Sequence, residues 1–88
     1  MNSIINLLQK ELTDYLTYTN TCKLAIETYT DDDLKEEYQY KLKRSQIHID
    51  YYQQLIEYQN IHKLSASKLQ DKIKHDNRLL KLKLSKVN

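Results

Sequence analysis

Apolar and polar residues alternate along this chain with helical spacing, and the pattern predicts three helices. From about residue 3 to residue 29, apolar or small side chains recur three and four positions apart without a break, as in a helix that packs against a neighbour. These positions are Ile5, Leu8, Leu12, Tyr15, Thr19, Cys22, Ile26 and Tyr29. Further apolar stripes predict a second helix over about residues 32–64 and a third over about residues 67–87.

The second predicted helix carries apolar side chains on two faces instead of one. At 3.6 residues per turn, one face consists of Leu34, Tyr38, Leu42, Ile49, Tyr52 and Ile56. The other face consists of Tyr40, Ile47, Tyr51, Leu55 and Tyr58. Because one neighbouring helix cannot bury both faces, we expect the second helix to be the central element of the fold.

A short polar stretch, residues 30–33, separates the first two helices. Thr and Asp side chains accept hydrogen bonds from the free N–H groups at a helix start, and the negative charge of Asp suits the positive end of the helix dipole. We expect a capping box between Thr30 and Asp33, or between Asp33 and Glu36. Because the connection is so short, the first two helices should form an antiparallel hairpin.

Residues 65–67, Ser-Ala-Ser, are predicted to separate the second helix from the third. Ser67 and Gln70 have the spacing of a capping box at the start of the third helix. The alternative is one uninterrupted helix. The helical spacing of the apolar positions continues through this stretch with one irregular step of three residues, and a locally overwound helix accommodates such a step. We favour the break.

Composition narrows the fold class to all-α. The chain has 88 residues and contains no Gly and no Pro, although average usage would supply about ten of them. Without Gly, tight β-hairpin turns and phosphate-binding loops are both disfavoured. We expect one helical domain, a long antiparallel hairpin plus a basic C-terminal helix with coiled-coil or bundle-like packing. Small domains often gain stability by association, so we also expect a homo-oligomer, a dimer in the simplest case.

Cysteine usage and the first residues indicate an intracellular location. The single cysteine, Cys22, excludes an internal disulfide and fits a reducing compartment. The apolar run of residues 4–8 is too short and too polar for a signal peptide or a membrane span. We therefore expect a cytoplasmic protein. Abundant Tyr, Ile, Asn and Lys beside two Ala and two Arg indicate an AT-rich, low-GC source.

Charge is distributed unevenly along the chain. Residues 1–40 carry a net charge of −5 and residues 66–88 a net charge of +5, within a total of +2. The basic residues of the third helix are Lys68, Lys72, Lys74, Arg78, Lys81, Lys83 and Lys86. This helix is either simply solvated, or neutralises the acidic part of its own hairpin or of a second copy, or binds an external acid such as a nucleic acid. It lacks interleaved aromatic residues and matches no named nucleic-acid-binding motif.

The sequence contains no catalytic signature, cofactor loop or metal-binding motif, so we expect a non-enzymatic protein without cofactor or metal. Cys22 lies at an apolar position and is expected to be a small core residue, with a reactive thiol as the alternative. His48 and His62 are expected on the same side of the second helix, about 21 Å apart, so they cannot share a metal within one chain. Ferritin-like di-iron bundles bind metal through a Glu that lies three residues before a His. Here Ser45 occupies that position before His48, so the carboxylate ligand is missing and we do not assign the chain to that family.

Eight tyrosines precede the third helix, and some of them are candidates for a binding surface. Tyrosine combines rigid apolar area with a hydroxyl group and is enriched at protein interfaces. We expect Tyr38 and Tyr52 to lie in the core. The candidate partner-binding residues are Tyr40, Ile47, Tyr51 and Tyr58, unless the third helix packs against them.

These observations favour a small helical binding protein that acts through protein–protein contacts as a regulator, inhibitor or adaptor. Phages and other mobile elements encode proteins of this general character. The alternative is a nucleic-acid-binding accessory protein that uses the basic third helix. A metal-binding bundle is a third hypothesis and requires ligands from another helix or subunit.

Overall fold

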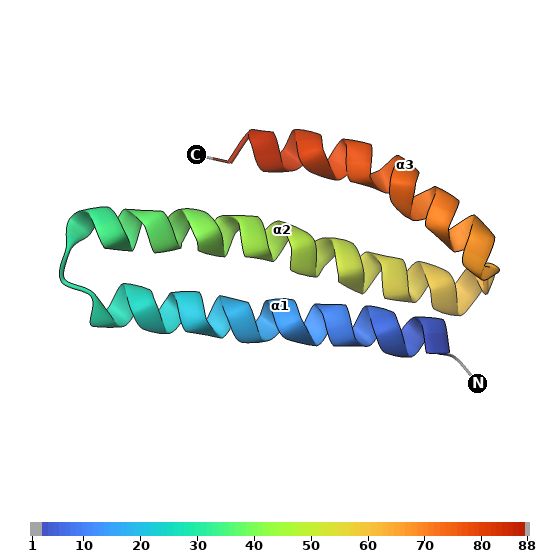
Figure 1. Ribbon diagram of the computed structural model, residues 1–88, viewed down its shortest axis with the longest axis horizontal. Helices are drawn as coiled ribbons and strands as arrows, with labels where there is room; N and C mark the ends of the chain where they lie inside the picture. Colours follow the sequence, from blue (N-terminus) through green and yellow to red (C-terminus); the bar gives the residue numbers. More distant parts are fainter. Residues whose placement is uncertain (1–2, 88) are drawn as a thin grey trace.

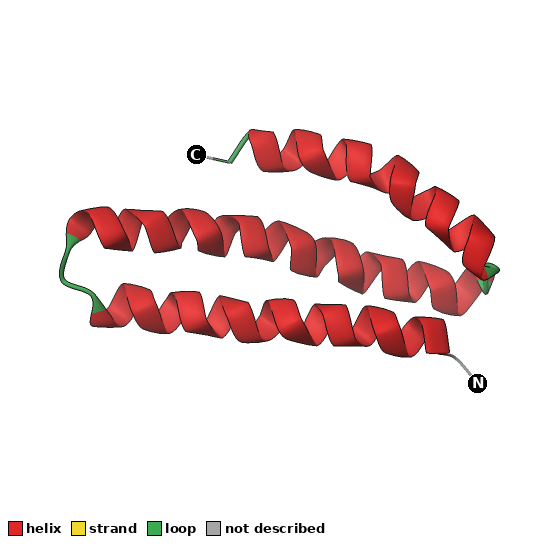
Figure 2. Cartoon of the chain, viewed as in Figure 1, coloured by secondary structure: helices red, strands yellow, loops and turns green. Residues whose placement is uncertain are grey.

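A computed structural model describes residues 3–87 as three α-helices joined by two short connections (Figures 1 and 2). Helix α1 spans Ser3–Thr28, α2 spans Asp32–His62 and α3 spans Ala66–Ser85. Helices α1 and α2 form the predicted antiparallel hairpin, and no strand occurs among residues 3–87. The all-α prediction is therefore confirmed, and each helix ends within two residues of its predicted boundary.

The connection between α1 and α2 is closed by Asp31, which is the N-cap of α2. Its carboxylate accepts hydrogen bonds from the backbone N–H groups of Asp33 at 2.9 Å and Leu34 at 3.2 Å. Asp32 and Asp33 follow in the first turn, where their charge complements the helix dipole. Both predicted capping boxes are wrong because the cap lies one residue after Thr30 and the third helical residue is Leu34, which has no acceptor side chain.

Helix α2 ends because Lys63 adopts a left-handed conformation, with φ 49° and ψ 50°. The buried side chain of Gln59 holds this turn from inside. Its amide nitrogen donates to the Leu64 carbonyl at 2.9 Å, and its amide oxygen accepts from the Leu64 N–H at 3.3 Å. The predicted break between the second and third helices is thus confirmed.

Ser65 is the N-cap of α3, and its hydroxyl accepts a hydrogen bond from the Lys68 N–H at 3.4 Å. The predicted capping box of Ser67 and Gln70 is wrong, because the helix has already begun at Ala66. Ser65 and Ser67 are equally able to cap a helix by their side chains. The left-handed turn at Lys63 ends α2 and places Ser65 before the free N–H groups of α3.

The hairpin is held by apolar side chains together with a small polar layer near its centre. Ile5, Leu8 and Cys22 of α1 and Ile49 of α2 are buried. Thr19 and Ser45 are buried opposite one another and their hydroxyl groups are hydrogen-bonded, so neither is left unsatisfied.

Aromatic rings stack across the hairpin on either side of this layer. Tyr15 of α1 lies over His48 of α2 with ring centroids 4.6 Å apart. Nearer the connection, Tyr29 lies over Tyr38 at 5.6 Å. Tyr38 and Tyr52, which were expected in the core, are half-buried.

Helix α3 packs on a second face of α2, so α2 is the central element, as its two apolar faces predicted (Figure 1). The three helices meet where α2 gives way to α3, in a buried cluster of Leu8, Leu55 and Leu69. Leu64 and Ile73 cover the edges of this cluster.

The three helices form an open, elongated layer instead of a closed bundle. The molecule measures 48 × 27 × 15 Å, and its radius of gyration is 15.3 Å, compared with about 12 Å for a compact domain of this length. Its accessible surface is 6665 Å², and a folded monomer of 10.6 kDa is expected to expose about 5,500 Å². About 1,200 Å² of surface is therefore exposed beyond what a compact monomer of this mass would show. Among residues 3–87, no helix is long and apolar enough to cross a bilayer.

Candidate functional site

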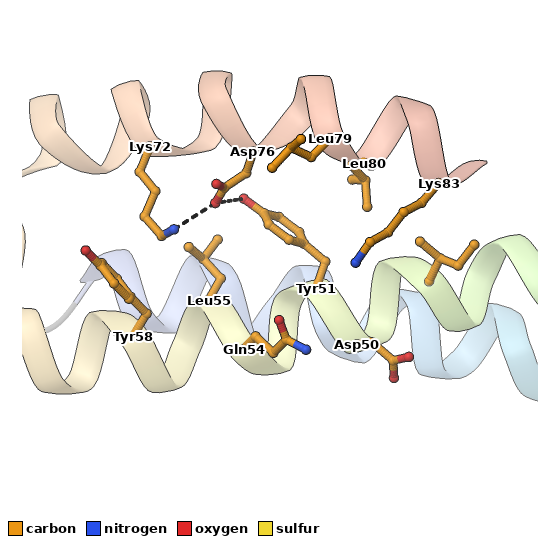
Figure 3. Close-up of a pocket in the computed structure, with 11 residues that line it drawn as sticks. Asp50, Tyr51, Gln54, Leu55, Tyr58, Lys72, Asp76, Leu79, Leu80 and Lys83 are labelled. Atoms are coloured by element: carbon orange, nitrogen blue, oxygen red, sulfur yellow. Dashed lines mark hydrogen bonds and ion pairs between the residues drawn. The ribbon is translucent and has the colours of Figure 1, made fainter. Parts of the chain in front are cut away.

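A crevice of about 310 Å³ lies between α2 and α3 (Figure 3). Its apolar walls are Ile47, Tyr51, Leu55 and Tyr58 of α2 and Leu79 and Leu80 of α3. Two lysines, Lys72 and Lys83, and two aspartates, Asp50 and Asp76, also line it. The crevice therefore combines an apolar floor with a few charged groups, as protein and ligand sites commonly do.

A polar contact joins the two walls of the crevice near its middle. The Tyr51 hydroxyl donates a hydrogen bond to Asp76 Oδ2 at 3.1 Å, and Lys72 Nζ lies 3.0 Å from the same oxygen (Figure 3). The side chain of Asp76 is only 16% exposed, so this carboxylate has little access to water. Burial raises the pKa of the Tyr51 phenol well above its ordinary range, and the charge and hydrogen bond of Asp76 raise it further.

Aromatic rings and a cation form one end of the crevice. Lys72 Nζ lies 4.3 Å from the ring centroid of Tyr58, within cation–π range. The Tyr58 ring also packs on His62 at 4.1 Å. Tyr58 is 37% exposed and Leu79, on the opposite wall, is 54% exposed. Apolar area at this rim is thus accessible to a partner.

Three of the four predicted partner-binding residues line the crevice, namely Ile47, Tyr51 and Tyr58. The alternative that this face packs on the third helix is supported by the contacts of Tyr51 with Asp76 and of Tyr58 with Lys72. The binding of a partner by these residues stays a prediction. Tyr40 lies beyond the crevice, with the Arg44 guanidinium 5.6 Å from its ring centroid. Arg44 Nη1 also donates to the Leu84 carbonyl at 3.3 Å, which fixes the far end of α3 against α2.

Sequence reasoning did not single out Asp76 or Leu79. The four-residue spacing of Lys72 and Asp76 is typical of a helical ion pair and was the available signal for Asp76. Nothing in the local pattern marked Leu79, because it flanks the stripe of apolar residues that packs on α2.

The basic residues of α3 are mostly exposed. Lys68, Lys74, Arg78, Lys81, Lys83 and Lys86 are exposed, whereas Lys72 is half-buried in the crevice. The ion pairs found among residues 3–87 each join two residues four positions apart within one helix. No described ion pair therefore links α3 to the acidic residues of the hairpin.

The remaining candidates for chemistry lie apart from one another. Cys22 is fully buried in the hairpin, as its expected role in the core requires. His48 stacks on Tyr15 of α1, and burial followed by the nearby charge of Arg44 lowers its pKa. His62 packs on Tyr58 at the C-terminal end of α2. Within residues 3–87, no three His, Cys, Asp or Glu side chains are grouped closely enough to hold a metal ion.

Comparisons with protein-family models, with curated proteins and with solved structures gave no significant match.

Proposed function

We propose that this chain is a small non-enzymatic binding protein that acts as a regulator, inhibitor or adaptor by holding a protein partner in the crevice between α2 and α3. The observation that carries the proposal is the apolar lining of the crevice, where Tyr58 on the α2 wall and Leu79 on the α3 wall remain exposed. Tyrosines and apolar side chains around a groove between two helices are typical of surfaces that receive a helix or loop of another protein.

The size of the exposed surface supports this proposal. A stable protein–protein interface buries about 800 Å² on each partner, and the chain exposes about 1,200 Å² beyond the expectation for a compact monomer. The three-helix layer is therefore large enough to offer a full interface without unfolding any helix.

The proposal is tested by recovering partners of the tagged protein from its native host at moderate salt after nuclease treatment, followed by mass spectrometry. Tyr58→Ala and Leu79→Ala should each lose a stoichiometric partner, because each removes exposed apolar area at the rim. Leu24→Ala is the matched control, since Leu24 is 63% exposed on α1 and does not line the crevice. Equal recovery with all three variants would contradict the proposal.

A second candidate function is supported by the charge of α3. Six exposed cations follow this helix, and none of them forms an ion pair with another described residue. A nucleic-acid-binding accessory protein would use them against phosphates. The affinity for a labelled duplex should then fall with salt, with a log–log slope of about 0.9 for each phosphate neutralised. Binding to the protein partner, in contrast, should survive the same increase in salt.

A further inference from the structure

One end of the molecule consists of two helices only. Helix α3 ends at Ser85, and its last turn is bound to α2 by the hydrogen bond from Arg44 to the Leu84 carbonyl. Residues 32–43 of α2 therefore extend beyond α3 (Figure 1). At 1.5 Å per residue this uncovered length is about 18 Å.

This uncovered end is acidic and partly apolar. Residues 27–37, which we call the acidic end, carry six carboxylates and one lysine, a net charge of −5. Three large side chains lie in or beside it with substantial exposure, Tyr29 at 40%, Leu34 at 37% and Tyr40 at 38%. The face of α2 that packs on α3 contains Arg44 and Tyr51. Counting back from Arg44 in steps of four and three residues, the same face continues at Tyr40, Glu37 and Asp33. A face that is covered by α3 further along is thus left open here.

The opposite combination lies in the last part of α3. Residues 77–87, which we call the basic end, contain four cations and no acidic residue, a net charge of +4. Leu82, which does not line the crevice, is exposed beside these cations at 59%. Within the described chain, no ion pair joins the basic end to the acidic end. Glu37 of the acidic end pairs with Lys41 on its own helix at 3.3 Å. The other described charges of the two ends form no ion pair, so each end presents unneutralised charge together with accessible apolar area.

We infer that a second copy of this chain covers these two regions, with the basic end of each copy lying on the acidic end of the other. Because one chain carries both signs of charge, a two-fold axis brings the two regions together twice and leaves neither unmatched. Complementary charge also disfavours any arrangement that places two acidic ends together.

The test is a pair of charge-reversed proteins, studied by sedimentation equilibrium across concentration. Glu36→Lys with Glu37→Lys changes two exposed carboxylates beyond the first turn of α2 and leaves the N-cap intact. Lys83→Glu with Lys86→Glu reverses two exposed cations of the basic end. The unaltered chain should reach twice its mass of 10.6 kDa. Each altered protein alone should dimerise at least about tenfold more weakly, because the net charge of the acidic end changes from −5 to −1, or that of the basic end from +4 to 0, so that most of the attraction is lost at both contacts.

Mixing the two altered proteins gives the decisive result. In a mixed dimer, the two altered ends meet at one contact, where little charge remains. At the other contact the unaltered acidic end of one copy, with charge −5, meets the unaltered basic end of its partner, with charge +4. A heterodimer should therefore form at concentrations where neither homodimer does. Circular dichroism of each protein shows whether the helices are kept. A monomeric unaltered chain, or altered proteins that dimerise as well as it does, or a mixture that stays monomeric, would each overturn the inference.

The protein partner proposed above is tested separately. Glu36→Lys with Glu37→Lys leaves every residue that lines the crevice unchanged. A failure of self-association therefore leaves recovery of a partner through Tyr58 and Leu79 intact, and the two outcomes are distinguishable.

Discussion

Removing one hydroxyl group from the crevice measures how firmly α3 is held on α2. Tyr51→Phe deletes the hydrogen bond to Asp76 and keeps the ring, while Lys72 still pairs with the carboxylate. Hydrogen bonds to charged groups contribute about 1.5–3 kcal/mol. Because Tyr51 is only half-buried and water can reach an open crevice, we expect a loss of about 1 kcal/mol in the free energy of unfolding.

The assay is urea unfolding and thermal unfolding followed by circular dichroism. A loss of about 1 kcal/mol lowers the melting temperature of a domain this small by about 4–8 °C. Tyr40→Phe is the matched control, because the Tyr40 hydroxyl accepts only an exposed hydrogen bond from Arg44 at 3.3 Å. Its effect should stay within about 0.5 kcal/mol. If Tyr51→Phe were as stable as the unaltered chain, the polar contact would not hold α3.

The same substitution has an alkaline signature. The pKa of Tyr51 is raised in the folded chain, by burial first and by Asp76 second, so folding favours the neutral phenol. This contribution is complete below the unfolded pKa of about 10 and is lost as pH rises above it. Tyr51→Phe should therefore lose less stability than the unaltered chain between neutral and strongly alkaline pH. Identical pH profiles for the two proteins would refute the reasoning.

Three further predictions concern the connection, the core and the hairpin face. Lys63→Gly should raise the free energy of unfolding by about 0.5–1 kcal/mol, measured by urea unfolding, because Gly adopts the left-handed conformation without strain; a decrease would contradict this. Cys22 should react with a thiol reagent only after addition of denaturant, because it is fully buried, and fast labelling of the folded chain would contradict its place in the core. His48 has a lowered pKa, so its contribution to stability is complete above about pH 6.5 and is lost as pH falls through the folded pKa. His48→Gln should accordingly flatten the stability profile on the acidic side of neutrality, and an unchanged acid slope would count against it.

The apolar pattern was sufficient to predict the three helices and the central place of α2. Helix periodicity is set by local geometry, and two apolar faces on one helix require two neighbours. The pattern does not identify those neighbours. Tyr51 is an example. Its apolar pattern allowed either a partner or the third helix as the neighbour, and in the structure its hydroxyl group donates a hydrogen bond to Asp76 of α3.

The details that sequence reasoning missed depend on positions of a few atoms. Asp31, Thr30 and Asp33 are all able to cap a helix, and only the backbone conformation at Asp31 decides between them. His48 was expected on the same side of the second helix as His62, but it stacks on Tyr15 of α1, whereas His62 packs on Tyr58. Small rotations of a helix about its axis move such residues from one neighbour to the other.

The cluster of Leu8, Leu55 and Leu69 has a consequence for the order of folding. Hairpin contacts nearest the connection at Asp31 close the shortest loops, so we expect them to form first. The contact of Leu8 with the start of α3 spans most of the chain and requires both helices of the hairpin to be in place. We therefore expect this contact to form late in folding. The hairpin would then be complete before α3 packs on α2.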